Sequence, residues 1–267
     1  LLRDLYFNWA SSRQAAKETL FDAALRLMNL TPQIKGPEHL AQLPETGGLL
    51  LVANHPFGIV DGLTMGHLGM RLRGNVRIMT NSLLCKVPEV DPYLLPVEFS
   101  GTAEARRLTG QTRRLAAGLL AEGKVVALFP AGGVATANSP VRKRAVDSEW
   151  HPFVGRLATI PDVTTVPVHF SGQNSRLFQL ASHLSLTLRL SLVFRETARR
   201  IGSRLRVRVG APIPFSEIAH IEDRAELVME LRKRTYELAR PEDVKGSNLD
   251  LHLREARIKG VKHKGDE

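Results

Sequence analysis

Short apolar runs alternate along the chain with longer segments whose apolar residues recur every three or four positions. The runs have the length of strands: GGLLLVAN at 47–54, NVRIMT at 75–80, LLPVEFS at 94–100, KVVALFP at 124–130, TTVPVHF at 164–170 and RLRVRVG at 204–210. The periodic segments predict helices at about 59–72, 103–121 and 216–238. This alternation predicts one α/β domain with a mostly parallel mixed β-sheet flanked by helices.

The two ends of the chain differ in pattern from this middle part. Residues 1–30 place apolar side chains at helical spacing, which predicts an amphipathic helical segment. It would either pack on the domain or lie in a membrane surface. Residues 31–240, which begin with the turn-rich TPQIKGPEH, form the predicted α/β domain. Residues 241–267 are charged and mostly unpatterned, so we expect a loose basic tail.

Composition narrows the class of protein. Hydrophobic residues make up 43% of the chain, enough for a packed core, and no apolar run reaches the roughly 18 residues that span a bilayer. The single cysteine, Cys85, excludes an internal disulfide framework and has no adjacent histidine, so we interpret it as a packing residue. We therefore expect a peripheral or soluble protein.

The net charge of +10 indicates an anionic partner, which would be nucleic acid, anionic lipid or an acidic carrier protein. Aromatic residues amount to only 6% and do not alternate with basic ones in the way that base stacking uses. We therefore expect no nucleic-acid partner. A basic cluster at Arg195, Arg199, Arg200, Arg204, Arg206 and Arg208 is either a binding patch or a solvated face.

The segment NHPFGIVDG, at 54–62, follows a predicted buried strand and begins a predicted helix. Functional sites of α/β proteins usually lie at such carboxyl ends of strands. His55 would sit on the turn and Asp61 one turn into the helix, so the two side chains could converge. A carboxylate fixes the tautomer of an imidazole, which can then take a proton from an attacking hydroxyl or amine. The alternative is a capped helix beside a hydrogen-bonded loop histidine.

Two further strand ends carry polar or flexible residues. FPAGGVATANSP, at 129–140, could present backbone donors to a ligand, and Arg142, Lys143 and Arg144 just beyond could hold an anionic head group. An ordinary turn followed by a solvated basic run is the alternative. His169, in VPVHFSGQNSR, is more typical of a packed histidine than of a catalytic one. No metal-binding spacing and no G-x-S-x-G elbow occur.

Together, NHPFGIVDG, FPAGGVAT and VPVHFSG resemble three blocks of the glycerol-phosphate and lysophosphatidic acid acyltransferase superfamily, in the family's order. Five residues separate His55 from Asp61, which is similar to the haemolysin-like and ornithine-lipid branch. The family usually has four. Ala131 and Gly133 stand where the family has Glu and Thr. The block in which the family has an arginine after an aromatic residue lacks that pattern here, and Arg106 and Arg107 are the nearest substitutes.

The resemblance implies an acyltransferase without a cofactor or metal, which uses acyl-CoA or acyl-ACP as co-substrate. His55 would be the general base, oriented by Asp61, and the acceptor a lysophospholipid or a lyso-aminolipid. The expected partners are a membrane surface with anionic lipid, at the cytoplasmic face of the inner membrane, and acyl carrier protein. The residues expected to contact substrate are Asn54, Pro56, Phe57, Gly58, Pro130, Ala131, Gly132, Gly133, Arg142 and Arg144.

Two alternatives stay open at the level of sequence. The chain could be a catalytically inactive membrane- or lipid-binding protein that keeps the fold, because Ala131 replaces the glutamate of the family's Phe-Pro-Glu-Gly-Thr block. It could instead bind nucleic acid through its basic surface, which would make binding strongly dependent on salt.

Overall fold

An eight-stranded sheet forms the centre of the computed structural model, which describes residues 18–245 except 87, 99, 138–143 and 185. Seven strands follow one another in the order β1-β7-β6-β2-β5-β3-β4, and β8 pairs with β6. Their bounds are β1 Thr31–Lys35, β2 Leu49–Ala53, β3 Arg77–Asn81, β4 Leu94–Val97, β5 Val125–Leu128, β6 Thr164–Phe170, β7 Arg204–Val209 and β8 Ile213–Pro214.

Most neighbouring strands of the sheet run parallel. β2 lies between β5 and β6 and is parallel to both, and β3 is parallel to β4 and β5. The antiparallel pairs are β6 with β7 and β6 with β8. This arrangement confirms the predicted α/β class with a mostly parallel mixed sheet.

The central strand β2 is buried along its whole length because helices cover both faces of the sheet. Its side chains alternate, so that Leu49, Leu51 and Ala53 enter one hydrophobic cluster. Leu50 and Val52 enter a second cluster on the other face. A strand buried on both faces reads as a continuous apolar run, and this explains why the sequence pattern located it well.

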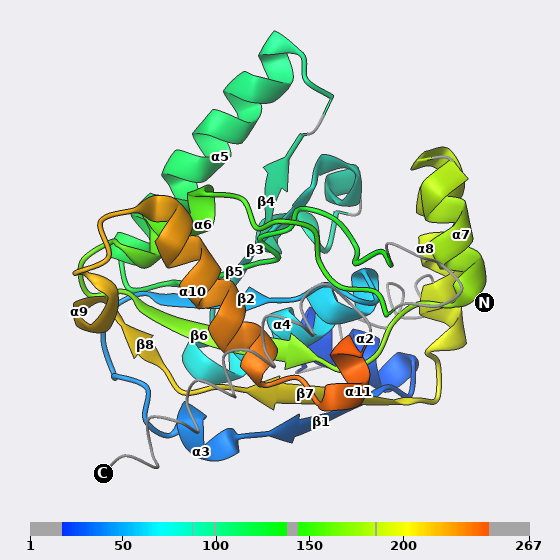
Figure 1. Ribbon diagram of the computed structural model, residues 1–267, viewed down its shortest axis with the longest axis horizontal. Coiled ribbons are helices and arrows are strands. Elements are labelled where there is room, and N and C mark those ends of the chain that lie inside the picture. Colours follow the sequence, from blue (N-terminus) through cyan, green and yellow to red (C-terminus); the bar gives the residue numbers. More distant parts are fainter. Residues whose placement is uncertain (1–17, 87, 99, 138–143, 185, 246–267) are drawn as a thin grey trace.

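The helices divide between these two faces (Figure 1). One face packs against α2 Leu20–Leu27 and α4 Ile59–Arg73. The other packs against α5 Ala103–Ala121, α6 Phe153–Ala158, α9 Phe215–Ile218 and α10 Arg224–Glu237. The remaining helical elements are α3 Pro37–Leu40, α7 Arg176–Leu184, α8 Leu186–Arg199, α11 Pro241–Val244 and two 3-10 turns at Ser82–Lys86 and Asp91–Tyr93.

Three expectations about elements were wrong. TPQIK, read as turn-rich, forms the edge strand β1, because each of its residues pairs with one in β7. The single helix expected at 216–238 is two helices, since Asp223 caps a new helix with its side chain, which accepts from the backbone N–H groups of Ala225 and Glu226. The tail expected to be loose from residue 241 begins with α11, where Val244 is buried.

The N-terminal segment is described only from residue 18. Its helix α2 begins at an N-cap, Thr19, whose hydroxyl accepts from the backbone N–H of Asp22. Phe21 and Leu25 are buried in the cluster shared with α4, so this part packs on the domain. The aromatic edge expected at Tyr6, Phe7 and Trp9, and most of the basic tail, lie outside the described residues. In the described part, no helix combines the length and apolar character needed to cross a bilayer.

Candidate active site

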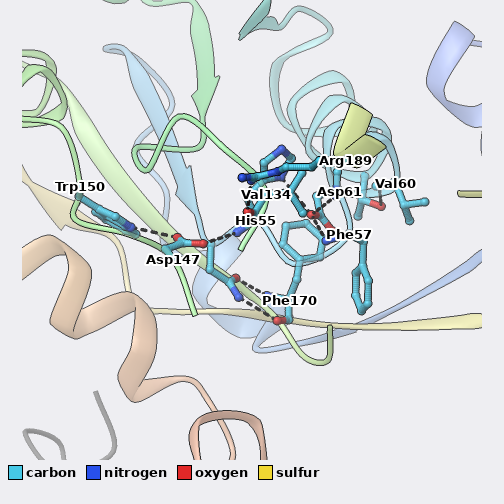
Figure 2. A network of polar contacts seen from close by, with 12 residues as sticks. His55, Phe57, Val60, Asp61, Val134, Asp147, Trp150, Phe170 and Arg189 are labelled. Carbon is cyan, nitrogen blue, oxygen red and sulfur yellow. Dashed lines mark hydrogen bonds and ion pairs between the residues drawn. The ribbon is translucent and has the colours of Figure 1, made fainter. Parts of the chain in front are cut away.

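His55 and Asp61 meet where β2 ends and α4 begins. The loop after Ala53 turns at Gly58, whose φ of 86° favours glycine, and α4 starts at Ile59. Asp61 lies in the first turn of the helix, where a negative charge is stabilised by the helix dipole. Its Oδ2 lies 3.0 Å from Nδ1 of His55. The predicted convergence of the two side chains is therefore observed (Figure 2).

The Asp61 carboxylate is held in place by backbone donors as well. Its Oδ2 also accepts from the N–H groups of Phe57 and Gly58, at 2.8 and 3.0 Å, and the side chain is fully buried. The carboxylate thus fixes both the loop and the ring. A carboxylate acceptor at Nδ1 requires the proton on that nitrogen, which leaves Nε2 of a neutral imidazole unprotonated and able to accept a proton.

The backbone of His55 is fixed on both sides. Its N–H donates to Oδ1 of Asp147 at 3.0 Å, and its C=O accepts from the N–H of Ala135 at 2.8 Å. The imidazole stacks on the Phe129 ring with 3.9 Å between ring centroids. The His55 side chain keeps 16% exposure, so the ring is supported on one face while remaining reachable.

Asp147 is a buried carboxylate that the sequence analysis missed. Besides the backbone of His55, it accepts from the indole N–H of Trp150 at 3.0 Å (Figure 2). Burial raises its pKa to about 6, against the opposing effect of these two hydrogen bonds. The backbone N–H of Asp147 donates to the hydroxyl of Tyr236 on α10, and Arg232 donates to its carbonyl. Asp147 therefore links the His55 loop to α10.

The FPAGGVAT loop after β5 lies beside the His55 loop, as expected for neighbouring parallel strands. Gly132 adopts a φ of 70°, which favours glycine, and its N–H donates to the carbonyl of Phe129. The guanidinium of Arg189 on α8 donates to the carbonyl of Val134 (Figure 2). Burial lowers the pKa of Arg189. An added Cβ at Gly133 would lie 3.2 Å from that guanidinium, so this small residue leaves room for it.

Arg200 is a second partly buried cation near the His55 loop. Its guanidinium lies 3.9 Å from the centre of the Phe57 ring and donates to the carbonyl of Gln173 at 3.0 Å. Burial lowers its pKa, and the nearby carboxylates of Asp61 and Glu196 oppose that effect. Arg200 was expected in a surface patch, but it packs on the loop that carries the histidine. No sequence signal marked Arg189.

The other residues predicted to bind substrate fall into different settings. Asn54 is buried, and its amide bonds both the N–H and the C=O of Phe170, so it joins the ends of β2 and β6. Pro56 and Pro130 are buried, whereas Ala131 is partly exposed. Arg144 is exposed near the end of the loop, and Arg142 lies outside the described residues. Their binding roles stay predictions.

His169 is a buried histidine rather than a member of this cluster. It is 1% exposed and contacts the Tyr236 ring edge-on, with 5.6 Å between ring centroids. Within the described ranges, no three His, Cys, Asp or Glu side chains gather as a metal site would require. The chemistry that the cluster supports is proton transfer at His55 Nε2, in a site where the backbone and the ring are already fixed.

Comparison with known proteins identifies the family of this chain. A family described as acyltransferase matches residues 12–245. A lyso-glycine lipid O-acyltransferase of Phocaeicola vulgatus is 27% identical over 226 residues, which cover 81% of this chain and 76% of that protein. A protein of the same description from Bacteroides thetaiotaomicron is 26% identical over 203 residues, covering 73% and 70%.

A solved structure, the 1-acyl-sn-glycerophosphate acyltransferase PlsC of Thermotoga maritima, is similar with a TM-score of 0.49 and 17% identity, covering 82% of this chain and 75% of the other. The match to the acyltransferase family includes the whole described part of the chain. The three sequence blocks lie in the same matched region, and His55 and Asp61 pair as the resemblance implied. This chain belongs to the acyltransferase family.

Proposed function

We propose that this protein transfers a fatty acyl chain from a thioester, acyl-ACP or acyl-CoA, to the hydroxyl of a lyso-aminolipid. The observation that carries the proposal is the hydrogen bond between His55 Nδ1 and the fully buried Asp61. The two relatives described as lyso-glycine lipid O-acyltransferases favour a lyso-aminolipid over a lysophospholipid. Ala131, which stands at the position of the family glutamate, is consistent with an acceptor other than glycerol phosphate.

In the proposed reaction one imidazole acts first as a general base and then as a general acid. His55 Nε2 takes the proton of the acceptor hydroxyl while the hydroxyl oxygen attacks the thioester carbonyl carbon. The C–S bond then breaks, and the leaving thiolate takes the proton back from the imidazolium, so an ester and a free thiol result. Asp61 keeps the proton on Nδ1 and stabilises the transient imidazolium. No metal or cofactor takes part in these steps.

His55→Ala should lower turnover by about 10²–10⁴-fold, the usual contribution of a general base. The assay is release of free thiol from acyl-ACP and acyl-CoA, with lysophospholipids and with amino acids that carry one hydroxylated acyl chain as acceptors. His67→Ala is the matched control, because His67 lies on the same helix and pairs with another carboxylate, Asp22. It should keep turnover near wild type. Full activity of His55→Ala would remove the base assignment.

The same panel tests the acceptor class. Thiol release that depends on an amino acid with one hydroxylated acyl chain supports the proposal, whereas release that depends only on a lysophospholipid contradicts the lyso-aminolipid assignment. No stimulation by any acceptor would favour the inactive lipid-binding alternative instead.

A further inference from the structure

Exposed apolar side chains gather on the hairpin formed by α7 and α8. Scattered exposed leucines are normal in soluble proteins, whereas a cluster marks an interaction surface. In the described part of the chain, nine large apolar side chains are exposed, and six of them lie on this hairpin: Leu177, Leu180, Leu184, Leu188, Leu190 and Phe194. The hairpin stands at the side of the molecule opposite α9 (Figure 1).

The helix α7, which carries half of these exposed apolar side chains, is packed against the protein, and the residue before it is hydrogen-bonded to a residue near the end of α8. Leu177, Leu180 and Leu184 are spaced three and four residues apart, so they share one face of α7, whereas Phe178 on another face is fully buried. The N–H of Ser175, which precedes α7, donates to the carboxylate of Glu196 at 2.9 Å, and this carboxylate is buried near the end of α8. The exposure therefore does not come from a frayed helix end.

The same hairpin borders the loop after β5 that lies beside His55. On α7, Gln179 accepts from the N–H of Ala137 at 2.8 Å, and His183 contacts the carbonyl of the same residue at 2.8 Å.

The second helix of the hairpin contacts the same region. On α8, Arg189 donates to the carbonyl of Val134. An added Cβ at Gly58 would lie 3.4 Å from a methyl group of Val193 on α8. The hairpin that carries the apolar surface is thus next to the candidate active site.

The exposed charges of the hairpin are positive. Between residues 176 and 199 the sequence has a single carboxylate, Glu196, and this one is buried. Arg195 and Arg199 on α8 are exposed. A surface that is apolar and basic matches the interface of an anionic bilayer, where apolar side chains enter the acyl region and arginines remain among the head groups.

We propose that the outward face of α7 and α8, the docking face, binds the surface of a bilayer that contains anionic lipid. The acceptor would then reach His55 from the leaflet on which the protein lies. That second statement rests on the proposed function, because it requires a lipid acceptor. Binding to the bilayer does not require catalysis, so the two proposals can fail separately.

Vesicle flotation tests the docking face directly. The triple variant Leu180→Gln/Leu184→Gln/Phe194→Gln should lower partitioning onto vesicles of phosphatidylglycerol and phosphatidylcholine by at least about tenfold, since three apolar side chains no longer enter the acyl region. The matched control Leu115→Gln/Met229→Gln changes two exposed apolar side chains on α5 and α10 and should bind like wild type. His55→Ala should also bind like wild type while losing turnover.

The arginines separate an electrostatic contribution from an apolar one. Arg195→Gln/Arg199→Gln should lower binding to the anionic vesicles by about 30-fold at low salt, and should leave binding to pure phosphatidylcholine unchanged. The control Arg107→Gln/Arg114→Gln removes two exposed arginines from α5 and should have a much smaller effect. Equal losses in the two arginine variants would mean that the net charge acts rather than the docking face.

A labelled position gives a readout that does not depend on loss of binding. In a Cys85→Ser background, an environment-sensitive dye on Leu184→Cys should shift to the blue when vesicles are added, and the dye on Met229→Cys should not. No shift at 184, or triple-variant binding equal to the control, would overturn the proposal. So would a dimer of the wild-type protein that forms without vesicles and dissociates in the triple variant, because a second copy would then cover the face.

Discussion

The position of His55 depends on residues that lie far from it in the sequence. Asp147 accepts from the backbone N–H of His55 and from Trp150, and Ala135 donates to the carbonyl of His55. The ring itself is oriented by Asp61. Because the backbone and the side chain are held by different partners, a substitution at Asp147 should move the imidazole without removing its carboxylate.

Asp147→Ala tests this positioning role. The substitution leaves the N–H groups of His55 and Trp150 without an acceptor, and each should lower the free energy of unfolding by about 1–3 kcal/mol. Because the imidazole is then misplaced, kcat should fall by up to about 100-fold. KM should change little, because Asp147 lies behind the loop. Trp150→Phe is the control, since Asp147 then still accepts from His55, and it should keep most of kcat. Steady-state kinetics and thermal unfolding of both variants measure these effects; a folded Asp147→Ala enzyme with wild-type kcat would contradict the role.

At the scale of elements, the placement of α4 depends on how closely α2 approaches it. An added Cβ at Gly66 would lie 2.2–2.5 Å from three atoms of the Phe21 ring, whereas Gly62 on the same helix has nothing within 4 Å. Gly66→Ala should therefore lower the free energy of unfolding by about 1–3 kcal/mol, and Gly62→Ala should raise it by up to about 1 kcal/mol. Chemical denaturation measures both; an equally stabilised Gly66→Ala would show that α2 does not pack so tightly.

Local signals explain which elements the sequence predicted well. α5 has the predicted bounds because Thr102 caps its start and Gly123 follows its end, and β6 is a buried apolar run. β1 escaped prediction because an edge strand with alternating exposure has no apolar run, and it forms only through pairing with β7. No prediction covered α7 and α8, although their apolar and polar residues alternate at helical spacing.

For the candidate site too, the sequence predicted the residues that lie close together along the chain and missed those that only folding brings together. His55 and Asp61 are six positions apart, so the motif itself placed them together. Asp147 lies 92 positions from the residue that it holds, and Arg189 comes from a different helix, so only the folded chain brings them to the loop. The sequence predicted Arg200 as part of a basic cluster. Its packing on the Phe57 ring follows from its position directly after the end of α8, which the sequence did not predict.

At the scale of the whole molecule, two buried groups give opposite responses of stability to pH. Burial lowers the pKa of His169 to about 4; Asp243 opposes this effect, and Arg208 and Arg240 reinforce it. Because its pKa is lower in the folded state, His169 contributes stability that is present above about pH 6.5 and lost as the pH falls toward 4. The raised pKa of Asp147, about 6, has the reverse sign: its contribution is present at low pH and lost as the pH rises through 6.

His169→Phe isolates the first of these effects, because the contribution of Asp147 is common to both proteins. A fall of the pKa from 6.5 to about 4 corresponds to about 3 kcal/mol. Between pH 6.5 and 4, wild type should therefore lose up to about 3 kcal/mol more stability than the variant, whatever constant offset the larger ring introduces. Urea denaturation at several pH values measures that difference, with His220→Gln at an exposed histidine as control. If the difference in free energy of unfolding between wild type and His169→Phe does not change with pH, protonation of His169 does not destabilise the folded protein in acid.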